Sequence, residues 1–234
     1  MSAVSAELRE AVCLANQDLA GSGLVEGTFG NVSGVDRANG VFVIKPSGVA
    51  YEELTPDVMV PVSLETGRVL DGSFRPSSDT PTHLELYRAF PCGGIAHTHS
   101  EMATAFAQAR LAIPCLGTTH ADHFHGDVPV TRALTETEVA TDYERHTGHV
   151  IVEAFETLGL SPMEIPGALV ASHGPFAWGT DAAEAVVHAQ ILEQVARMAF
   201  VVHVLAPDAE RPAAHLIDKH YFRKHGDDAY YGQP

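Results

Sequence analysis

Residues 93–100, with the sequence GGIAHTHS, constrain the fold of this chain more than any other stretch. The glycine turn and the apolar run that open it predict a buried strand. Side chains on a strand alternate between its two faces, so His97 and His99 should project from one face, about 6–7 Å apart. Ser100 then occupies a typical N-cap position, and Glu101 follows in the first turn of a helix. The stretch therefore predicts a buried strand that presents two imidazoles just before a helix.

Two imidazoles at this spacing can bind one divalent ion such as Zn²⁺, although the chain has 14 histidines and the pair could also be structural. Their position at the carboxyl end of a strand favours a ligand-binding role, because open parallel α/β sheets bind ligands there. Two more residues could complete the site. Asp79 precedes the helix that leads into this strand and is either an N-cap or a metal carboxylate. His173 follows the apolar run 167–171 and is either structural or a third ligand.

Composition narrows the class of protein. At 234 residues, the chain is expected to form one domain over residues 1–234. Its formal net charge of −16 argues against binding to nucleic acid or to an anionic membrane. Cys13, Cys92 and Cys115 form no CxxC motif, which favours a reducing, cytoplasmic setting over a disulfide framework. We find neither a leader pattern nor a run of 18 apolar residues, so no membrane association is expected.

Small polar residues gather at the ends of several expected strands. An Asn-Gly turn at Asn39 and Gly40 predicts a hairpin, with Gly30-Asn31 near one end and the KPSG sequence at residues 45–48 after the other. Residues 77–78 add two serines before the helix that follows Asp79. Backbone N–H groups in such segments can approach an anion, and Lys45 supplies a positive charge. Ordinary turns are the alternative.

The second half of the chain contains a histidine-dense loop and a basic tail. Residues 117–126 lack core periodicity and are rich in titratable groups, which is typical of loops that carry acids and bases, or simply of a solvated loop. Thr135 with Glu138, and Asp181 with Glu184, predict capped helices, the second reaching about Leu205. The tail after residue 207 is basic and either docks on a site or a neighbour, or is disordered.

Several motifs in one order from about Gly30 to the C-terminus are similar to those of the class II aldolase family, and within it to the L-ribulose-5-phosphate 4-epimerase branch. They are GNVSG, KPSG, PSSDTPTH, HTHS, GTTHAD, SHGPFAWG and DKHYFRKHG…YYGQ. The resemblance implies an α/β fold, a three-layer α/β/α sandwich with a mostly antiparallel central sheet, in place of the parallel sheet suggested above. It also implies a homotetramer with active sites between subunits.

The resemblance assigns a role to each matching position. It implies one divalent metal per chain, zinc in the first place with manganese or cobalt as alternatives, held by Asp79, His97, His99 and His173. It implies a substrate-binding set of Gly30, Asn31, Lys45, Ser47, Gly48, Ser77, Ser78, Thr118, Glu144 and His220. It also implies two acid/base groups, Asp122 and Tyr231, with Tyr231 supplied by the adjacent subunit. Two departures stand out: Phe29 replaces an expected tryptophan, and His123 and His125 replace aromatic residues beside Asp122.

The implied reaction interconverts L-ribulose 5-phosphate and D-xylulose 5-phosphate. Carbon 4 has no acidic C–H, so inversion requires cleavage of the bond between carbons 3 and 4, rotation of the aldehyde and re-addition. The metal acts as a Lewis acid, and each face of the aldehyde needs its own proton acceptor and donor. A class II sugar-phosphate aldolase is the alternative, although related aldolases carry Glu where this chain has Asp79. A non-catalytic, adducin-like binding protein is a further alternative, disfavoured by the intact set of metal ligands.

Overall fold

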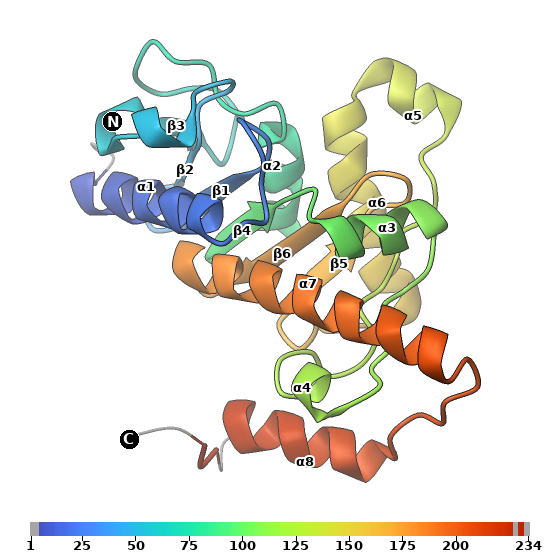
Figure 1. The fold of residues 1–234 in the computed structure, drawn as a ribbon. Helices are drawn as coiled ribbons and strands as arrows, with labels where there is room; N and C mark the ends of the chain where they lie inside the picture. The colour runs from blue at the N-terminus through green and yellow to red at the C-terminus, as the bar shows by residue number, and fades with distance from the viewer. Residues whose placement is uncertain (1–4, 227–228, 232–234) are drawn as a thin grey trace.

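A computed structural model describes residues 5–226 and 229–231. The described residues form one six-stranded sheet in the order β3-β2-β1-β4-β6-β5, and every pair of neighbours is antiparallel (Figure 1). The strands are β1 (Asn31–Asp36), β2 (Val41–Ile44), β3 (Val60–Ser63), β4 (Gly94–His97), β5 (Gly167–Leu169) and β6 (Pro175–Gly179). The antiparallel sheet is confirmed, and the parallel sheet inferred from the strand-end argument is wrong.

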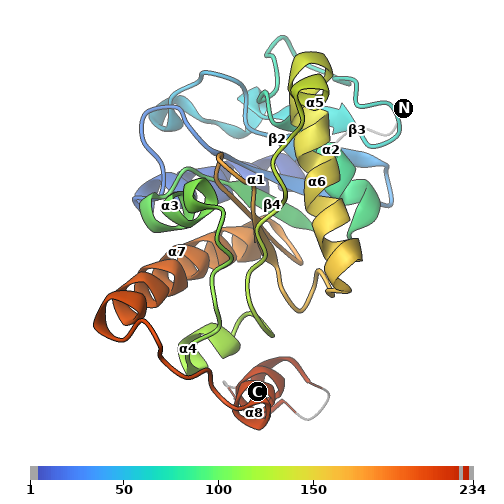
Figure 2. The ribbon, with the colours of Figure 1, turned by 90° about the vertical axis from the view of Figure 1, so that its right-hand side faces the viewer.

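Helices cover both faces of the sheet and make three layers. One face carries α1 (Ala6–Gly21), α3 (Glu101–Ala109) and α7 (Ala182–Leu205), and the other carries α2 (Thr80–Ala89) and α6 (Tyr143–Leu158). Figure 2 shows α3 and α7 on one side of the sheet and α2 and α6 on the other. The shorter elements are α4 (Thr118–Ala121), α5 (Glu136–Thr141), the 3₁₀ turns Tyr51–Glu53 and Pro56–Val58, and α8 (Ala214–His225).

Helix α7 is the main support of β4 and β6. Its inward residues, among them Ala185, Leu192 and Ala196, are fully buried, and their small or branched side chains let the helix lie close to the sheet. Asp181 caps its N-terminus by accepting a hydrogen bond from the Glu184 backbone N–H at 2.8 Å. The helix is long and apolar enough to cross a membrane by length and composition, but half of its most apolar window is buried in this fold. We therefore interpret α7 as a core helix.

Aromatic packing fixes the opposite face. Trp178 of β6 is fully buried and lies 5.1 Å from the ring centroid of Phe90 and 5.4 Å from that of Phe155. Its indole N–H donates to the Pro162 carbonyl at 2.6 Å, so the polar part of the ring is satisfied inside the core. This cluster packs α2 and α6 against β6, the strand beside β4.

Most local expectations from the sequence are confirmed. The hairpin of β1 and β2 turns at Asn39-Gly40, and the capping box of Thr135 and Glu138 is present. After β3 the chain returns to this strand with one isolated bridge, between Val62 and Val69, and then continues as an exposed loop. The basic tail forms α8, which packs on α4. Gly232 and Gln233 of the last motif lie outside the described residues.

Candidate metal centre

The two histidines of the HTH motif lie at the end of the central strand β4. His97 is the last residue of β4 and pairs with Asn31 of β1 on one side and with Phe176 of β6 on the other. The Phe176 ring stacks on the His97 imidazole at 4.1 Å between centroids. Gly30 has φ +75°, and a Cβ there would stand 2.9 Å from the His97 carbonyl oxygen. The backbone next to His97 therefore requires glycine, both for its left-handed conformation and for its close approach.

Three imidazoles converge on one point. His97, His99 and His173 each offer a ring nitrogen, and these atoms all lie within 4.8 Å of one another. The Nε2 atoms of His97 and His99 are 3.2 Å apart. Two nitrogens bound at about 2.0–2.1 Å to a tetrahedral ion stand about 3.3 Å apart. The three side chains therefore fit a divalent metal ion, and the described residues contain no other such group.

Neighbouring groups select the ring nitrogens that would bind the ion. The Nδ1 of His97 donates to the Pro175 carbonyl at 2.9 Å, which leaves the Nε2 lone pair free. The Nδ1 of His173 is paired with the Tyr143 hydroxyl at 3.2 Å, so Nε2 is the ring nitrogen that remains without a partner among the described residues. Burial, together with His97 and His99, lowers the pKa of His173 to about 3. His173 is therefore neutral at pH 7, as a histidine must be to bind a metal.

Asp79 lines the same cavity without joining the group of three. It stands at the N-cap position of α2, but its carboxylate makes no capping bond and instead accepts from Asn31 Nδ2 at 2.7 Å. Burial by itself would raise the pKa of Asp79. The nearby His97 and His83 and the hydrogen bond from Asn31 lower it by more, so the pKa lies below its ordinary value. Asp79 is therefore an ionised group in the same cavity as the imidazoles, which suits a ligand for a cation.

The cavity at the imidazoles has a volume of about 380 Å³ and brings together most of the predicted site. All four predicted metal ligands line it, with eight predicted substrate-binding residues. These eight are Gly30, Asn31, Lys45, Ser47, Gly48, Ser77, Ser78 and Glu144. Residues from β1, from the loop after β2 and from the start of α2 thus meet beside the end of β4. The four other predicted positions, Thr118, Asp122, His220 and Tyr231, do not line this cavity.

Lys45 supplies a buried positive charge to the cavity. Its side chain is 1% exposed, and its ammonium donates to the Val49 carbonyl at 2.8 Å. None of the ion pairs among the described residues involves Lys45. Burial lowers its pKa. The Asn31 Oδ1, also buried, has no hydrogen-bond partner among the described residues. A buried cation without a carboxylate partner favours an anionic ligand.

The remaining predicted residues form a second cluster on α4 and α8. Asp122 accepts hydrogen bonds from Arg223 at 2.9 Å and from His220 at 3.0 Å, and Lys224 lies 3.4 Å away. The centre of the Tyr231 ring lies 4.9 Å from the Arg223 guanidinium and 4.5 Å from the Lys224 ammonium, so Arg223 and Lys224 are neighbours of both Asp122 and Tyr231. In both ribbon views α4 and α8 lie apart from the turn between β4 and α3 (Figures 1 and 2). Asp122 and Tyr231 are thus neighbours in one chain, away from its own metal centre.

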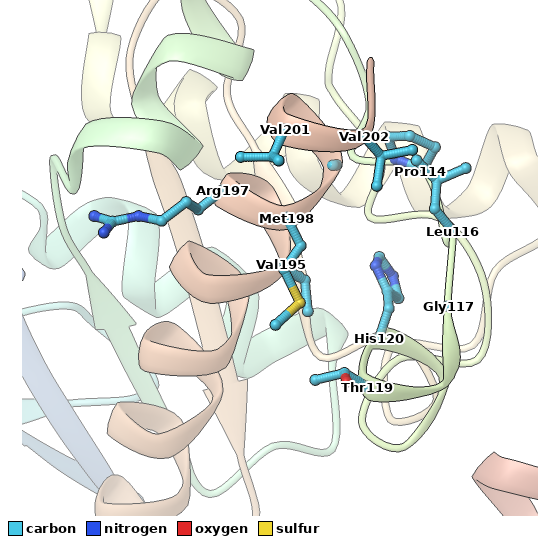
Figure 3. Close-up of a pocket in the computed structure, with 11 residues that line it drawn as sticks. Pro114, Leu116, Gly117, Thr119, His120, Val195, Arg197, Met198, Val201 and Val202 are labelled. Carbon is cyan, nitrogen blue, oxygen red and sulfur yellow. The ribbon is translucent and has the colours of Figure 1, made fainter. Parts of the chain in front are cut away.

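Another cavity, of about 420 Å³, separates α7 from residues 114–120 (Figure 3). Its walls are mainly apolar, with Val195, Met198 and Leu116 among them, and Arg197 points away from it. His120 is the titratable side chain that faces it, and its Nε2 is paired with the Gly126 carbonyl at 2.7 Å. This cavity therefore lacks the convergent polar groups of the metal centre.

One contributor to the centre, Tyr143, was missed from the sequence; it lines the cavity and its hydroxyl pairs with His173. Phe29, which the sequence marked only as a departure from the family tryptophan, also lines the cavity, with a ring stacked 6.5 Å from that of His99. Tyr143 stands next to Glu144, a residue that the family motifs did indicate, but it carries no motif of its own. Its role depends on α6 beginning at Tyr143, five residues before the apolar helix pattern becomes visible at Gly148.

A family model and several solved structures are similar to this chain over most of its length. The family model described as the class II aldolase and adducin N-terminal domain matches residues 10–200. An L-fuculose 1-phosphate aldolase superposes with a TM-score of 0.77 at 22% identity, over 93% of this chain and 95% of its own. The L-fuculose-1-phosphate aldolase of Thermus thermophilus has 27% identity and a TM-score of 0.66, over 88% of this chain and 99% of its own. YgbL from Klebsiella pneumoniae, described by the alternatives aldolase, epimerase and decarboxylase, has 24% identity and a TM-score of 0.70, over 93% of this chain and 99% of its own.

Proposed function

We propose that this chain, which belongs to the class II aldolase and adducin family, is a metal-dependent epimerase that interconverts L-ribulose 5-phosphate and D-xylulose 5-phosphate. One observation carries the proposal: a single cavity holds three convergent imidazoles and a buried lysine that has no carboxylate partner among the described residues. A sugar phosphate has a polar hydroxyketone at one end and a dianion at the other, so it matches both features. Residues 1–234 would form one domain of this family.

The imidazoles and Asp79 would hold a divalent ion, with zinc first and manganese or cobalt as alternatives. Such an ion would supply Lewis-acid stabilisation of the negative charge that develops as the bond between carbons 3 and 4 breaks. Asn31 would keep the Asp79 carboxylate turned toward the imidazoles, since it already donates to it at 2.7 Å. Tyr143 and the Pro175 carbonyl would keep His173 and His97 in the tautomer whose Nε2 faces the ion.

The phosphate would bind beside Lys45, in the part of the cavity that the KPSG segment lines. Lys45 would contribute the charge, and the hydroxyls and backbone N–H groups of Ser47, Gly48 and Ser78 would contribute hydrogen bonds. Gly48 has φ +71° with open space where a Cβ would stand, which leaves its backbone accessible. Firm binding matters for inversion, because the aldehyde fragment must rotate and re-add before it leaves. If the phosphate were no longer held, the aldehyde fragment would leave and the enzyme would act as an aldolase.

Asp122 and Tyr231 would serve as the two acid/base groups, one on each face of the aldehyde. One would take the proton from the carbon 4 hydroxyl during cleavage, and the other would return a proton to the oxygen on the opposite face after re-addition. Their position outside the cavity of their own chain favours an oligomer, which we propose is a homotetramer with active sites between subunits. Thr118 and His220 lie on the same α4 and α8 segments and would enter the site with them.

The contacts of Arg223 with both Asp122 and Tyr231 support one refinement. The sequence interpretation took Tyr231 alone from the adjacent subunit. Since Asp122 and Tyr231 share cationic neighbours within one chain, we propose that the same neighbouring subunit contributes both.

An aldolase with the same centre is the second candidate, favoured by the resemblance to the L-fuculose-1-phosphate aldolases. The state of Asp79 favours the epimerase. Its pKa is lowered and its carboxylate is held by Asn31, so it is better suited to hold a cation than to donate a proton.

We also propose a cytoplasmic location, because the three cysteines are all free and buried, as is usual in a reducing compartment.

The decisive experiment is to incubate the purified, zinc-loaded protein with L-ribulose 5-phosphate and to follow the products by NMR. The proposal expects D-xylulose 5-phosphate and no accumulation of free fragments. Accumulation of dihydroxyacetone and glycolaldehyde phosphate would instead establish the aldolase. The His97→Asn variant is the matched control for contaminating activity. If the wild-type protein binds zinc but converts neither epimer, this substrate assignment is wrong.

A further inference from the structure

Helix α3 begins without a cap from its own segment. Ser100 stands at the N-cap position, as the sequence predicts, but its side chain makes no capping hydrogen bond. The Ser100 Oγ is buried and has no partner among the described residues. The first N–H groups of a helix have no acceptor within the helix, so a buried helix end requires one from elsewhere.

Glu193 of α7 supplies that acceptor. Its Oε1 accepts from the Met102 backbone N–H at 2.9 Å, and its Oε2 accepts from the Ala103 backbone N–H at 2.9 Å. These are the second and third residues of α3, the positions that an N-cap side chain would satisfy. The Glu193 residue is 7% exposed, and its carboxylate lies at the positive end of the α3 dipole. The start of α3 is therefore capped by a residue that lies 91 positions away from Met102 in the sequence.

The capped helix end is also the anchor of the metal ligands. Only Ser100 separates His99 from the first residue of α3, so the path of residues 97–99 is fixed by β4 on one side and by this helix start on the other. The loop that carries His173 packs against the same turn, since a Cβ on Gly174 would stand 2.8 Å from the Thr98 carbonyl oxygen. A displaced helix start would therefore disturb all three imidazoles.

We infer that Glu193 is a positioning residue for the metal centre: its carboxylate, held on α7, sets the turn from which His97 and His99 converge with His173. This inference rests on the metal centre of the proposed function but not on the substrate. The helix that supports the sheet thereby also determines the geometry of the ligands.

The test is the Glu193→Gln variant, because glutamine has the same shape, carries no charge and turns an N–H₂ group toward backbone donors. We expect its dissociation constant for Zn²⁺, measured by competition with a chromophoric chelator, to rise at least about tenfold, the usual cost of losing a supporting group around a metal. The absorption spectrum of the Co²⁺-loaded variant should change as well, because the ligand geometry is altered.

Glu184→Gln is the matched control. Glu184 lies on the same helix and its carboxylate also satisfies a backbone N–H, that of Thr180 at 2.6 Å, but at the start of α7 and away from the imidazoles. Both variants should lose thermal stability, and only Glu193→Gln should lose metal affinity. If Glu193→Gln does not fold, Glu193→Asp keeps the charge on a side chain too short to span both N–H groups, and the same loss of affinity is expected.

Unchanged zinc affinity and an unchanged Co²⁺ spectrum in a folded Glu193 variant would overturn the inference and leave Glu193 a purely structural cap. Equal losses of affinity in the Glu193 and Glu184 variants would overturn it too. A wild-type protein that binds no divalent ion would refute the metal centre itself, and a wild-type protein that binds zinc but acts on another sugar phosphate would refute only the substrate.

Discussion

Subunit mixing can show which chain supplies each part of the active site. The perturbation combines two variants in one oligomer, His97→Asn, which breaks the candidate metal centre, and Asp122→Asn, which removes one of the two proposed acid/base groups on the α4 and α8 side. Each variant alone should retain at most about a hundredth of the wild-type kcat, the usual scale for a lost acid/base group or metal. The structure places the two positions in separate clusters of one chain, and this separation determines what a mixed oligomer can recover.

The activity that a mixed oligomer recovers depends on which subunits supply the two clusters. In a cyclic oligomer with randomly mixed chains in equal amounts, about a quarter of the interfaces pair an intact metal centre with an intact neighbouring cluster. A mixture of His97→Asn and Asp122→Asn should therefore recover about a quarter of the wild-type activity. A mixture of Asp122→Asn and Tyr231→Phe should recover none, because Arg223 contacts both residues within one chain and each chain then carries a broken cluster.

The assay uses chains with two different affinity tags, co-expressed and purified on both tags, with epimerase turnover measured per metal-loaded site. A mixture of His97→Asn with His99→Asn is the control, because both variants break the same centre and no arrangement of subunits restores it. Recovery of about a quarter in the mixture of Asp122→Asn and Tyr231→Phe would refute our interpretation of Arg223 and would place the two groups on different subunits. No recovery with His97→Asn and Asp122→Asn would place the whole site within one chain.

Three further predictions follow from single side chains. His97→Asn should lose most of its bound metal, as measured by elemental analysis, because two imidazoles bind more weakly than three; full metal content would place the centre elsewhere. Lys45→Met should raise KM about tenfold or more and release glycolaldehyde phosphate, because a buried cation is lost from the proposed phosphate site; unchanged kinetics would remove Lys45 from that role. His125 pairs with Glu164 at 3.0 Å and Asp218 at 2.8 Å, and although burial lowers its pKa, these hydrogen bonds raise it more, so its net pKa lies above the ordinary value. Its contribution to the docking of α8 is therefore complete below the ordinary histidine pKa and is lost as the pH rises through the raised one. Hydrogen-exchange protection of α8, corrected for intrinsic rates, should fall over that range in the wild type and be low and flat in His125→Phe; identical profiles would contradict this.

Local patterns in the sequence determined the elements that hold the site. Alternation along residues 95–99 predicted that the two imidazoles lie beside one another, and their ring centroids are 5.0 Å apart. The strand itself ends at His97, however, so His99 lies in the turn before α3 and not on the strand as predicted. The Asn-Gly turn between β1 and β2 and the caps of α5 and α7 were likewise predictable. These features depend on neighbours within a few residues, whose steric and hydrogen-bonding preferences act before any tertiary contact forms.

Family motifs supplied the long-range part of the sequence prediction. The strand-end argument suggested a parallel sheet and was wrong, because an apolar strand followed by a helix is compatible with either sheet type. The combined motifs indicated the antiparallel sandwich, and they joined the candidate metal ligands and the polar strand-end segments into one site. The same motifs named Asp122 and Tyr231 but did not show that the two residues share Arg223 and Lys224 as neighbours. These cations lie on a helix near the end of the chain, and only folding brings them to Asp122.

The tertiary structure alone decided how the candidate metal ligands are held. Ser100 satisfied every local rule for an N-cap, yet the buried carboxylate of Glu193 occupies the N–H groups that Ser100 would otherwise bind. Tyr143 and the Pro175 carbonyl select the free nitrogens of His173 and His97 in the same non-local way. A sequence specifies which groups can donate or accept, but a hydrogen bond needs two groups about 3 Å apart, and between distant segments only the packing of the helices on the sheet sets that distance.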